Sequence, residues 1–142
     1  MPAEPSDDEI RRILEASQTI VVVGASIKPA RPSHFVSRYL ADKGYRILPV
    51  NPGYAGQRLF GETVLPDLDS LPLVPDMVAI FRRSEHAGAV ADTACARGIR
   101  FVWMQVGIRD DAAAARARAC GAAVVMNRCL MVDHRRLALP AR

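Results

Sequence analysis

The stretch Thr19-Ile20-Val21-Val22-Val23-Gly24-Ala25-Ser26 decides the fold. Its unbroken run of β-branched residues over 19–23 predicts a strand buried on both faces, as strands of parallel sheets are. The glycine, alanine and serine that follow predict a tight turn where the backbone can approach a ligand. A buried strand that runs into such a turn is how a Rossmann-type fold begins.

Strands and helices alternate along the rest of the chain. Further buried strands are predicted at 46–50, 75–81, 99–104 and 123–126. Helices are predicted to begin at Pro32-Ser33, at Ser84, at Asp110 and at Asn127, and glycines at 44, 98 and 121 end three helices. The segment 59–73 is harder to interpret, with a short strand near 63–65 and a helical turn at 68–71. The alternation predicts an α/β protein with a doubly wound parallel sheet, a three-layer α/β/α arrangement in a single domain.

The first 18 residues form a segment of their own in this interpretation. Ser6-Asp7-Asp8-Glu9 has the pattern of a capping box, in which a serine hydroxyl accepts from a helical amide and the glutamate reaches back. The helix that it opens carries apolar residues on one face. We therefore expect residues 1–18 to form an N-terminal helix that packs on a domain spanning 19–142.

Composition narrows the class of partner. The chain has 142 residues and a net charge of +4, and Lys28 and Lys43 are its only lysines. Arginine suits bidentate recognition of phosphate. Because no basic run is interleaved with aromatics and no apolar stretch could span a bilayer, we expect neither a nucleic-acid nor a membrane partner. The acidic residues 1–8 are not a signal peptide. Three cysteines without a CxxC motif indicate a reduced, cytoplasmic protein.

Candidate binding residues lie where the predicted strands end. The carboxyl ends of parallel strands share one edge of the sheet, where ligands of such folds bind. Four separate pieces of the sequence should therefore meet there: Gly24, Ala25 and Ser26; Asn51 and Pro52; Phe81, Arg82 and Arg83; and Gln105 with Gly107.

The charges at these ends indicate a ligand that carries an additional phosphate. The second strand ends in Asn51-Pro52-Gly53, without the carboxylate that would accept from a ribose hydroxyl of NAD. Lys28 and Arg31 follow the first turn instead and could bind phosphate. The residues alone therefore predict a dinucleotide-like ligand with an additional phosphate.

No catalytic group stands out. His34, His86 and His134 are scattered and share no metal-ligand spacing, so we interpret them as surface or helix residues. Cys129 lies near a predicted helix start, where a thiolate would be favoured, but no histidine pairs with it in the sequence. We interpret it as a small apolar residue and assign no catalytic residue and no metal site.

The chain resembles the small stand-alone CoA-binding domain proteins, which are similar to the N-terminal CoA-binding domain of the succinyl-CoA synthetase α subunit. The resemblance spans about residues 19–137. It rests on the motifs Val23-Gly24-Ala25-Ser26, Arg31-Pro32-Ser33, Pro49-Val50-Asn51-Pro52, Phe81-Arg82-Arg83-Ser84, Trp103-Met104-Gln105-Val106-Gly107 and Val124-Val125-Met126-Asn127-Arg128-Cys129, together with Pro29 and Gly44-Tyr45.

The resemblance implies coenzyme A bound across the strand ends. The first loop, with Gly24, Ala25, Ser26, Lys28 and Arg31, would contact the phosphates. The second-strand end, Asn51 and Pro52, would flank the adenosine. Phe81, Arg82 and Arg83 would line the middle of the ligand, and Gln105 and Gly107 would complete the site. The histidine that is phosphorylated in the synthetase belongs to a second domain, so ligase activity is not implied.

Two departures and two alternatives accompany this prediction. Asn127 replaces an aspartate and Asp133-His134 replaces Glu-His in the family pattern; both are placed in the predicted C-terminal helix, where they would affect packing. The alternatives are an NADP-dependent reductase and an interaction module with a vestigial site. A homodimer or an enzyme is the expected protein partner, with the surface near Trp103 and the C-terminal helix as the pairing face.

Overall fold

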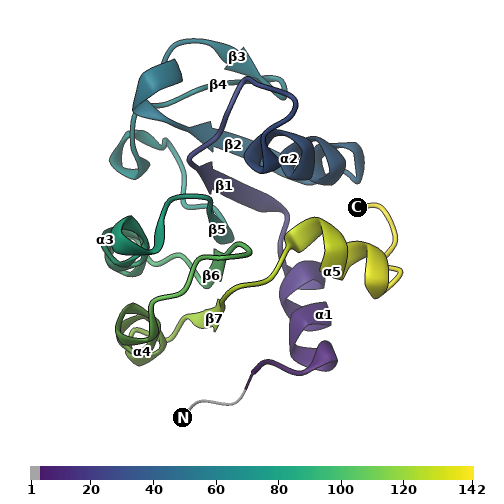
Figure 1. Cartoon of the computed structure of the whole chain (residues 1–142), viewed down its shortest axis with the longest axis vertical. Coiled ribbons are helices and arrows are strands. Elements are labelled where there is room, and N and C mark those ends of the chain that lie inside the picture. The colour runs from purple at the N-terminus through teal and green to yellow at the C-terminus, as the bar shows by residue number, and fades with distance from the viewer. Residues whose placement is uncertain (1–3) are drawn as a thin grey trace.

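The computed structural model describes residues 4–142, so Met1–Ala3 of the acidic N-terminal segment lie outside the described residues. A five-stranded, fully parallel sheet crosses the molecule (Figure 1). In chain order its strands are β1 (Thr19–Val23), β2 (Arg46–Val50), β5 (Met77–Ile80), β6 (Phe101–Met104) and β7 (Ala123–Val125). Their spatial order is β2-β1-β5-β6-β7, so the order reverses between β1 and β5.

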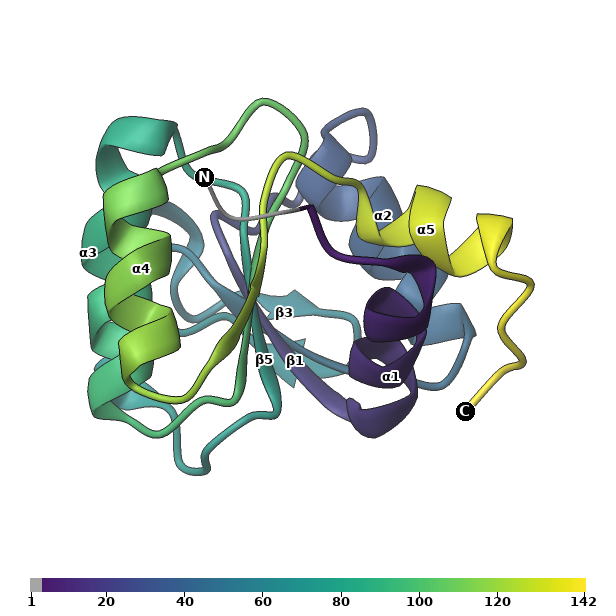
Figure 2. The ribbon, with the colours of Figure 1, turned by 90° about the horizontal axis from the view of Figure 1, so that it is seen from below.

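Helices cover both faces of the sheet (Figure 2). On one face lie α1 (Asp7–Ala16), α2 (Pro32–Asp42) and α5 (Leu130–Arg136), and on the other lie α3 (Ser84–Ala96) and α4 (Asp111–Ala119). This confirms the predicted Rossmann-type, three-layer α/β/α architecture. Between β2 and β5 the chain forms four short elements, namely the 3₁₀ turns Pro52–Tyr54 and Leu68–Ser70 and the paired strands β3 (Arg58–Leu59) and β4 (Glu62–Thr63).

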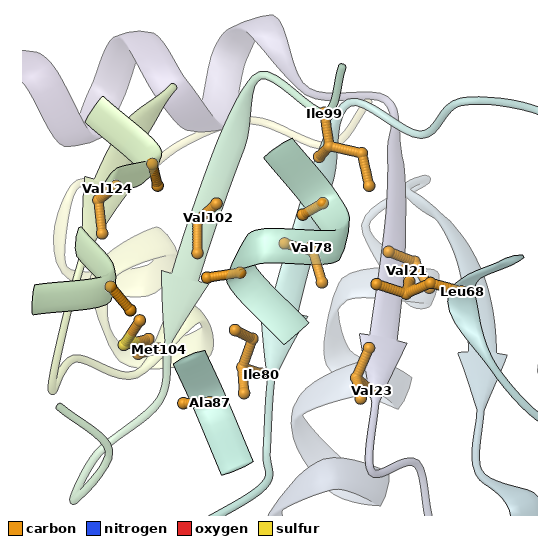
Figure 3. Packing of buried hydrophobic residues seen from close by; sticks show 14 of the residues in the cluster. Val21, Val23, Leu68, Val78, Ile80, Ala87, Ile99, Val102, Met104 and Val124 are labelled. Carbon is orange, nitrogen blue, oxygen red and sulfur yellow. The ribbon is translucent and has the colours of Figure 1, made fainter. Parts of the chain in front are cut away.

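Apart from Thr19 and Arg46, which begin β1 and β2, the strands of this sheet are apolar, because successive side chains point to opposite faces and both faces are covered. Figure 3 shows the face under α3 and α4, where Val21, Val78 and Val102 point the same way from three neighbouring strands. Their chain neighbours Ile20, Met77 and Trp103 belong to the cluster under α1, α2 and α5. Trp103 is fully buried there, so the expected exposed pairing face around it is wrong.

Several predicted element ends are shifted by local hydrogen bonding. Helix α3 begins at Ser84 but its N-cap is Arg83, because the Ser84 hydroxyl instead accepts from the Arg109 amide at 3.0 Å. Beyond β4, only a bridge between Val50 and Leu65 extends the predicted strand at 63–65. Asn127 does not open the C-terminal helix, which begins three residues later. Half of the predicted capping box is present: the Glu9 amide donates to the Ser6 hydroxyl at 3.1 Å, but the Glu9 carboxylate accepts from the Ser6 hydroxyl at 3.4 Å rather than from its amide.

The cysteines do not match the expectation of three reduced thiols. Cys95, at the end of α3, and Cys120, just after α4, form a disulfide, with their Cα atoms 6.1 Å apart. That spacing is within the usual range for disulfides. The two cysteines are 25 residues apart in the sequence and meet because they lie on neighbouring helices, so no CxxC motif marks them. Cys129 is the free cysteine.

Helix α1 shares its core with the sheet. Ile10, Ile13 and Leu14 are buried in the same cluster as the residues of β1 and α5. None of the helices within residues 4–142 is long and apolar enough to cross a membrane.

Candidate functional site

The chain leaves β1 and β5 in opposite directions, and a cavity opens over the carboxyl ends of these strands. Its volume is about 740 Å³, within the range of ligand pockets. Five segments that are distant in the sequence line it. They contribute Gly24, Ser26, Lys28, Arg31, Pro32, Ser33, Phe35 and Val36 after β1; Asn51 and Tyr54 after β2; Phe81 after β5; Gln105, Val106 and Ile108 after β6; and Cys129, Met131 and Val132 before and in α5.

A second, smaller cavity of about 310 Å³ lies on the α3 side of the same edge. Gly24 lines both cavities, so the two meet at the first turn. The smaller cavity is lined by Val23, Gly24, Val50, Pro52, Pro66, Asp67, Leu68, Asp69, Arg82, His86, Ala89, Val90 and Thr93. A single elongated ligand that passes over Gly24 could occupy both.

The turn after β1 is shaped by Gly24. Its φ of +92° lies in the region that favours glycine. A side chain at this position would meet the Phe81 carbonyl oxygen at 3.1 Å and Cδ of Arg82 at 3.2 Å. The amides of Gly24 and Ala25 both donate to the Val50 carbonyl, at 2.9 and 3.2 Å, so the turn is anchored to β2. Those two amides are therefore not free to bind a phosphate.

The loop that follows is fixed by side chains rather than by secondary structure. The Ser26 hydroxyl accepts from the Lys28 amide at 3.1 Å, and the Ser26 carbonyl accepts from Nδ1 of the buried His34 at 2.8 Å. Asn51 donates through Nδ2 to the Ala25 carbonyl at 2.8 Å and accepts through Oδ1 from the Gly53 amide at 2.8 Å. The Asn51 amide thus holds the first turn against the second-strand end, so it shapes the wall of the larger cavity.

Three cations border the cavities without an acidic partner. Lys28 and Arg31 line the larger cavity and Arg82 the smaller one, and no carboxylate of residues 4–142 forms an ion pair with any of them. Arg83 differs, because its largely exposed guanidinium lies 3.8 Å from Glu85. Free cations around a concave surface favour an anionic ligand.

The structure brings most, but not all, of the predicted residues to a cavity wall. Seven of the twelve line the larger cavity: Gly24, Ser26, Lys28, Arg31, Asn51, Phe81 and Gln105. Pro52 and Arg82 line the smaller one. Ala25 is buried beneath the turn, and Arg83 and Gly107 line neither cavity. Gly107 instead donates its amide to Oδ1 of Asn127 at 2.7 Å.

Asn127 and Arg128 have structural roles that the sequence did not reveal. Asn127 adopts a left-handed conformation with φ +57°, which asparagine tolerates, and so holds the loop after β6 through Gly107. Arg128 donates to both carboxylate oxygens of the buried Asp133, at 2.7 and 2.8 Å. This pair raises the pKa of Arg128 and positions the start of α5 beside the cavity.

Gln105 presents one half of its amide to the larger cavity. Its side chain is 5% exposed, and Oε1 accepts from the Leu130 amide at 2.9 Å. This bond sets the orientation of the amide. Within residues 4–142, Nε2 of Gln105 has no protein acceptor and is available to a ligand.

Groups for chemistry are sparse at this edge. His34 and His134 lie on helices, as expected, but both are buried, and only His86 is exposed. Within residues 4–142, no three His, Cys, Asp or Glu side chains gather closely enough to hold a metal ion. Cys129 is half-buried on the wall of the larger cavity.

A family model described as CoA binding domain matches residues 18–135. This chain belongs to the CoA-binding domain family. Among curated relatives, the uncharacterized protein YneT of Bacillus subtilis is 36% identical over 130 residues, which are 92% of this chain and 95% of YneT.

Two solved structures share the fold of this chain over nearly its whole length. A Thermus thermophilus protein is 40% identical with a TM-score of 0.89, and the match covers 94% of this chain and 99% of that one. A protein from Pyrococcus horikoshii OT3 is 32% identical with a TM-score of 0.88, and the match covers 97% and 99%.

A larger protein contains a similar fold. The dinucleotide-forming acetyl-coenzyme A synthetase 1 of Ca. Korarchaeum cryptofilum, in its apo form, is 24% identical with a TM-score of 0.66. The match covers 78% of this CoA-binding domain chain but only 26% of the synthetase. At that identity the likeness concerns the fold alone.

Proposed function

We propose that this protein binds coenzyme A, or a thioester of it, across the carboxyl edge of its sheet. The observation that carries the proposal is the pair of cavities that meet at Gly24, bordered by three cations with no acidic partner in the described chain. Coenzyme A is long, carries phosphates near its middle and at one end, and has a neutral arm. A site made of two joined cavities that are bordered by cations suits that shape. Membership of the CoA-binding domain family also supports the proposal.

The adenosine would occupy the smaller cavity. Pro52, Leu68 and Val90 give it apolar walls, and a base can pack against such surfaces. Arg82 lies on the same wall, where its guanidinium could bind a phosphate attached to the ribose. The end of β2, where a fold that binds NAD would carry a carboxylate for the ribose, holds Asn51 instead.

The pyrophosphate and the pantetheine arm would lie over and beyond Gly24. Lys28 and Arg31 supply charge for the pyrophosphate, because the Gly24 and Ala25 amides are already bonded to Val50. The neutral arm would continue into the larger cavity between Phe81 and Gln105, where the free Nε2 of Gln105 can donate to one of its carbonyls.

The proposed role is binding without catalysis, as a carrier, a sensor or a partner of an enzyme. Its support is that the residues lining the two cavities form no nucleophile–base pair. A cytoplasmic location is also proposed. The free thiol of Cys129 is compatible with it, whereas the Cys95–Cys120 disulfide is uncommon in that compartment.

The direct test is calorimetric titration of the ligand-free protein with CoA, dephospho-CoA, NADP and NAD in parallel. We expect CoA to bind tightly, dephospho-CoA more weakly and NAD not at all. A preference for NADP would assign the chain to the reductases. Silence with all four ligands would refute the proposal and leave an interaction module.

Arg82 and Arg83 form a matched pair for mapping the site. Arg82→Ala should weaken CoA binding by roughly 1.5–3 kcal/mol, the range of hydrogen bonds to charged groups. Arg83→Ala removes the same charge one residue away but outside both cavities. It should change the affinity much less. Equal losses would mean that the arginines act only through their overall charge.

A further inference from the structure

Exposed apolar side chains form part of the wall of the larger cavity. Within residues 4–142, five large hydrophobic residues are exposed, and three of them line this cavity: Phe35 at 41%, Val106 at 64% and Val132 at 51%. Single exposed hydrophobic residues are ordinary on protein surfaces. Here, however, three of them line the same cavity, although they come from α2, the loop after β6 and α5. Together they form an apolar wall that is accessible to a ligand.

The three side chains differ in how they lie relative to the cations. Val106 follows β6, two strands across the sheet from β1, whose following loop carries Lys28 and Arg31. Phe35 is close to these cations along the chain, because its amide donates to the Arg31 carbonyl at 3.1 Å. Val132 comes from α5, which packs against α2. The apolar wall therefore extends from the loop after β6 to α5 and α2, and at α2 it adjoins Arg31.

Two further apolar residues line the same cavity. Ile108 follows Val106 in the loop after β6, and Met131 precedes Val132 in α5. The polar group on this side is Gln105, whose free Nε2 faces the cavity while its Oε1 is held by Leu130. One amide donor beside an apolar wall fits a carbonyl followed by a hydrocarbon chain.

We propose that the physiological ligand is a thioester of coenzyme A with an apolar acyl chain, and that Phe35, Val106 and Val132 contact the chain. The inference rests on the proposed function, because the nucleotide must bind across Gly24 for the acyl group to reach this wall. Gln105 would donate through Nε2 to a carbonyl close to the thioester. Specificity for the acyl group would then come from the β6 and α5 side of the cavity.

The test compares the affinities of CoA, acetyl-CoA and octanoyl-CoA by calorimetry. Full burial of one methylene corresponds to roughly a fourfold gain in affinity, and in an open groove we expect roughly 1.5-fold per methylene. Octanoyl-CoA should therefore bind roughly tenfold more tightly than acetyl-CoA. Equal affinities of the two thioesters would overturn the inference while leaving CoA binding intact. Absence of binding by all three ligands would overturn both proposals.

A pair of variants tests where the acyl chain of the ligand binds. In the double variant Val106→Ser with Val132→Ser, the preference for octanoyl-CoA over acetyl-CoA should fall to roughly a third or less of its wild-type value. Val74→Ser is the matched control, since Val74 is 55% exposed but lies before β5, at the opposite edge of the sheet, and lines neither cavity. It should leave the preference unchanged. An unaltered preference in the double variant, or equally tight binding of sodium octanoate alone, would overturn the inference.

Discussion

Gly24 carries two constraints at once, one from its own backbone and one from its neighbours. Its φ of +92° is unfavourable for any residue with a side chain, and the Phe81 carbonyl and the Arg82 stem leave little space beside it. The same residue lines both cavities. The shape of the ligand path therefore depends on the absence of one methyl group.

Gly24→Ala should lower the free energy of unfolding by roughly 1–3 kcal/mol, from the positive φ and from crowding. Gly98→Ala is the control, because Gly98 also has a positive φ, +76°, but an added Cβ would meet nothing within 4 Å. Urea unfolding should show the larger loss for Gly24→Ala, and titration should show weakened CoA binding for that variant only. A loss no larger than that of Gly98→Ala would mean that the space beside Gly24 is not limiting.

His134 is fully buried in the folded protein. The Tyr39 hydroxyl lies 2.8 Å from its Nδ1, and within residues 4–142 its Nε2 has no partner. Burial lowers the pKa of His134 below its usual value of 6.5, and the positive charge of Lys43 acts in the same direction. The unfolded chain therefore binds a proton more readily at this site than the folded one does.

Stability should accordingly fall as the pH drops below about 6.5. The contribution of His134 is complete above that pH and is lost towards its lowered folded pKa. Urea unfolding at pH 7.5 and pH 5.5 should show a larger loss for the wild type than for His134→Gln, which cannot take up the proton. Parallel losses in the two proteins would assign the pH dependence to other groups.

At the scale of elements, Asp76 joins the beginnings of β1 and β5. One carboxylate oxygen accepts from the amides of Gln18 and Thr19 at 2.8 and 3.0 Å and from the Thr19 hydroxyl at 3.2 Å. The other lies 3.3 Å from Arg100. Partial burial would raise the pKa of Asp76, but these hydrogen bonds outweigh it, and the pKa lies below the usual 3.8.

Asp76→Ala should lower the free energy of unfolding by roughly 2–4 kcal/mol, because two backbone amides lose their acceptor. Asp76→Asn keeps an acceptor and should lose less. The carboxylate's contribution is present above pH 3.8 and is lost as the pH falls through the lowered pKa, so acid should destabilise the wild type more than the alanine variant. Denaturant melts at pH 7 and pH 3 check both statements, and equal stability of Asp76→Ala and wild type would contradict them.

The elements themselves were predictable because their signals are local. The Val/Ile run of β1 and the glycines that end the helices require no knowledge of the rest of the chain. Contacts between distant residues were not predictable. Cys95 and Cys120 meet only because α3 and α4 pack together, and Trp103 is buried by helices from both ends of the chain.

The candidate site divides along the same line. Lys28, Arg31 and Phe81 were placed at the ligand edge because strand ends converge in any parallel sheet. Whether neighbouring arginines face a cavity depends on the direction of their side chains, which the sequence does not specify. Arg82 lines the smaller cavity, whereas Arg83 points to solvent beside Glu85. The apolar wall of Phe35, Val106 and Val132 was not predictable from the sequence, since these residues lie on three separate segments and none is unusual alone.

At the scale of the molecule, the disulfide between Cys95 and Cys120 links α3 to α4 covalently within one helical layer. Closing a loop of this length in the unfolded chain corresponds to about 3.5 kcal/mol of stabilisation. Reduction should therefore lower the free energy of unfolding by about that amount. Urea unfolding with and without dithiothreitol measures the difference.

The double variant Cys95→Ser with Cys120→Ser is the control for reduction. It should be as unstable as the reduced wild type and indifferent to dithiothreitol, and Cys129 remains in it as a free thiol. If the variant still responded to the reductant, Cys129 rather than the disulfide would be responsible. Wild type that is unaffected by complete reduction would show that the covalent link adds nothing to the packing of α3 on α4.

The sheet separates two apolar clusters, and the two cavities draw on them unequally. Val23, Leu68 and Val90 of the α3 side line the smaller cavity, whereas Val36 and Met131 of the α2 and α5 side line the larger one, together with Ile108 of the α3 side. Substitutions that share no partners usually have additive effects. If the ligand binds as proposed, changes at Val106 and Val132 can therefore alter the preference for an acyl group while the adenosine contacts in the smaller cavity stay as they are.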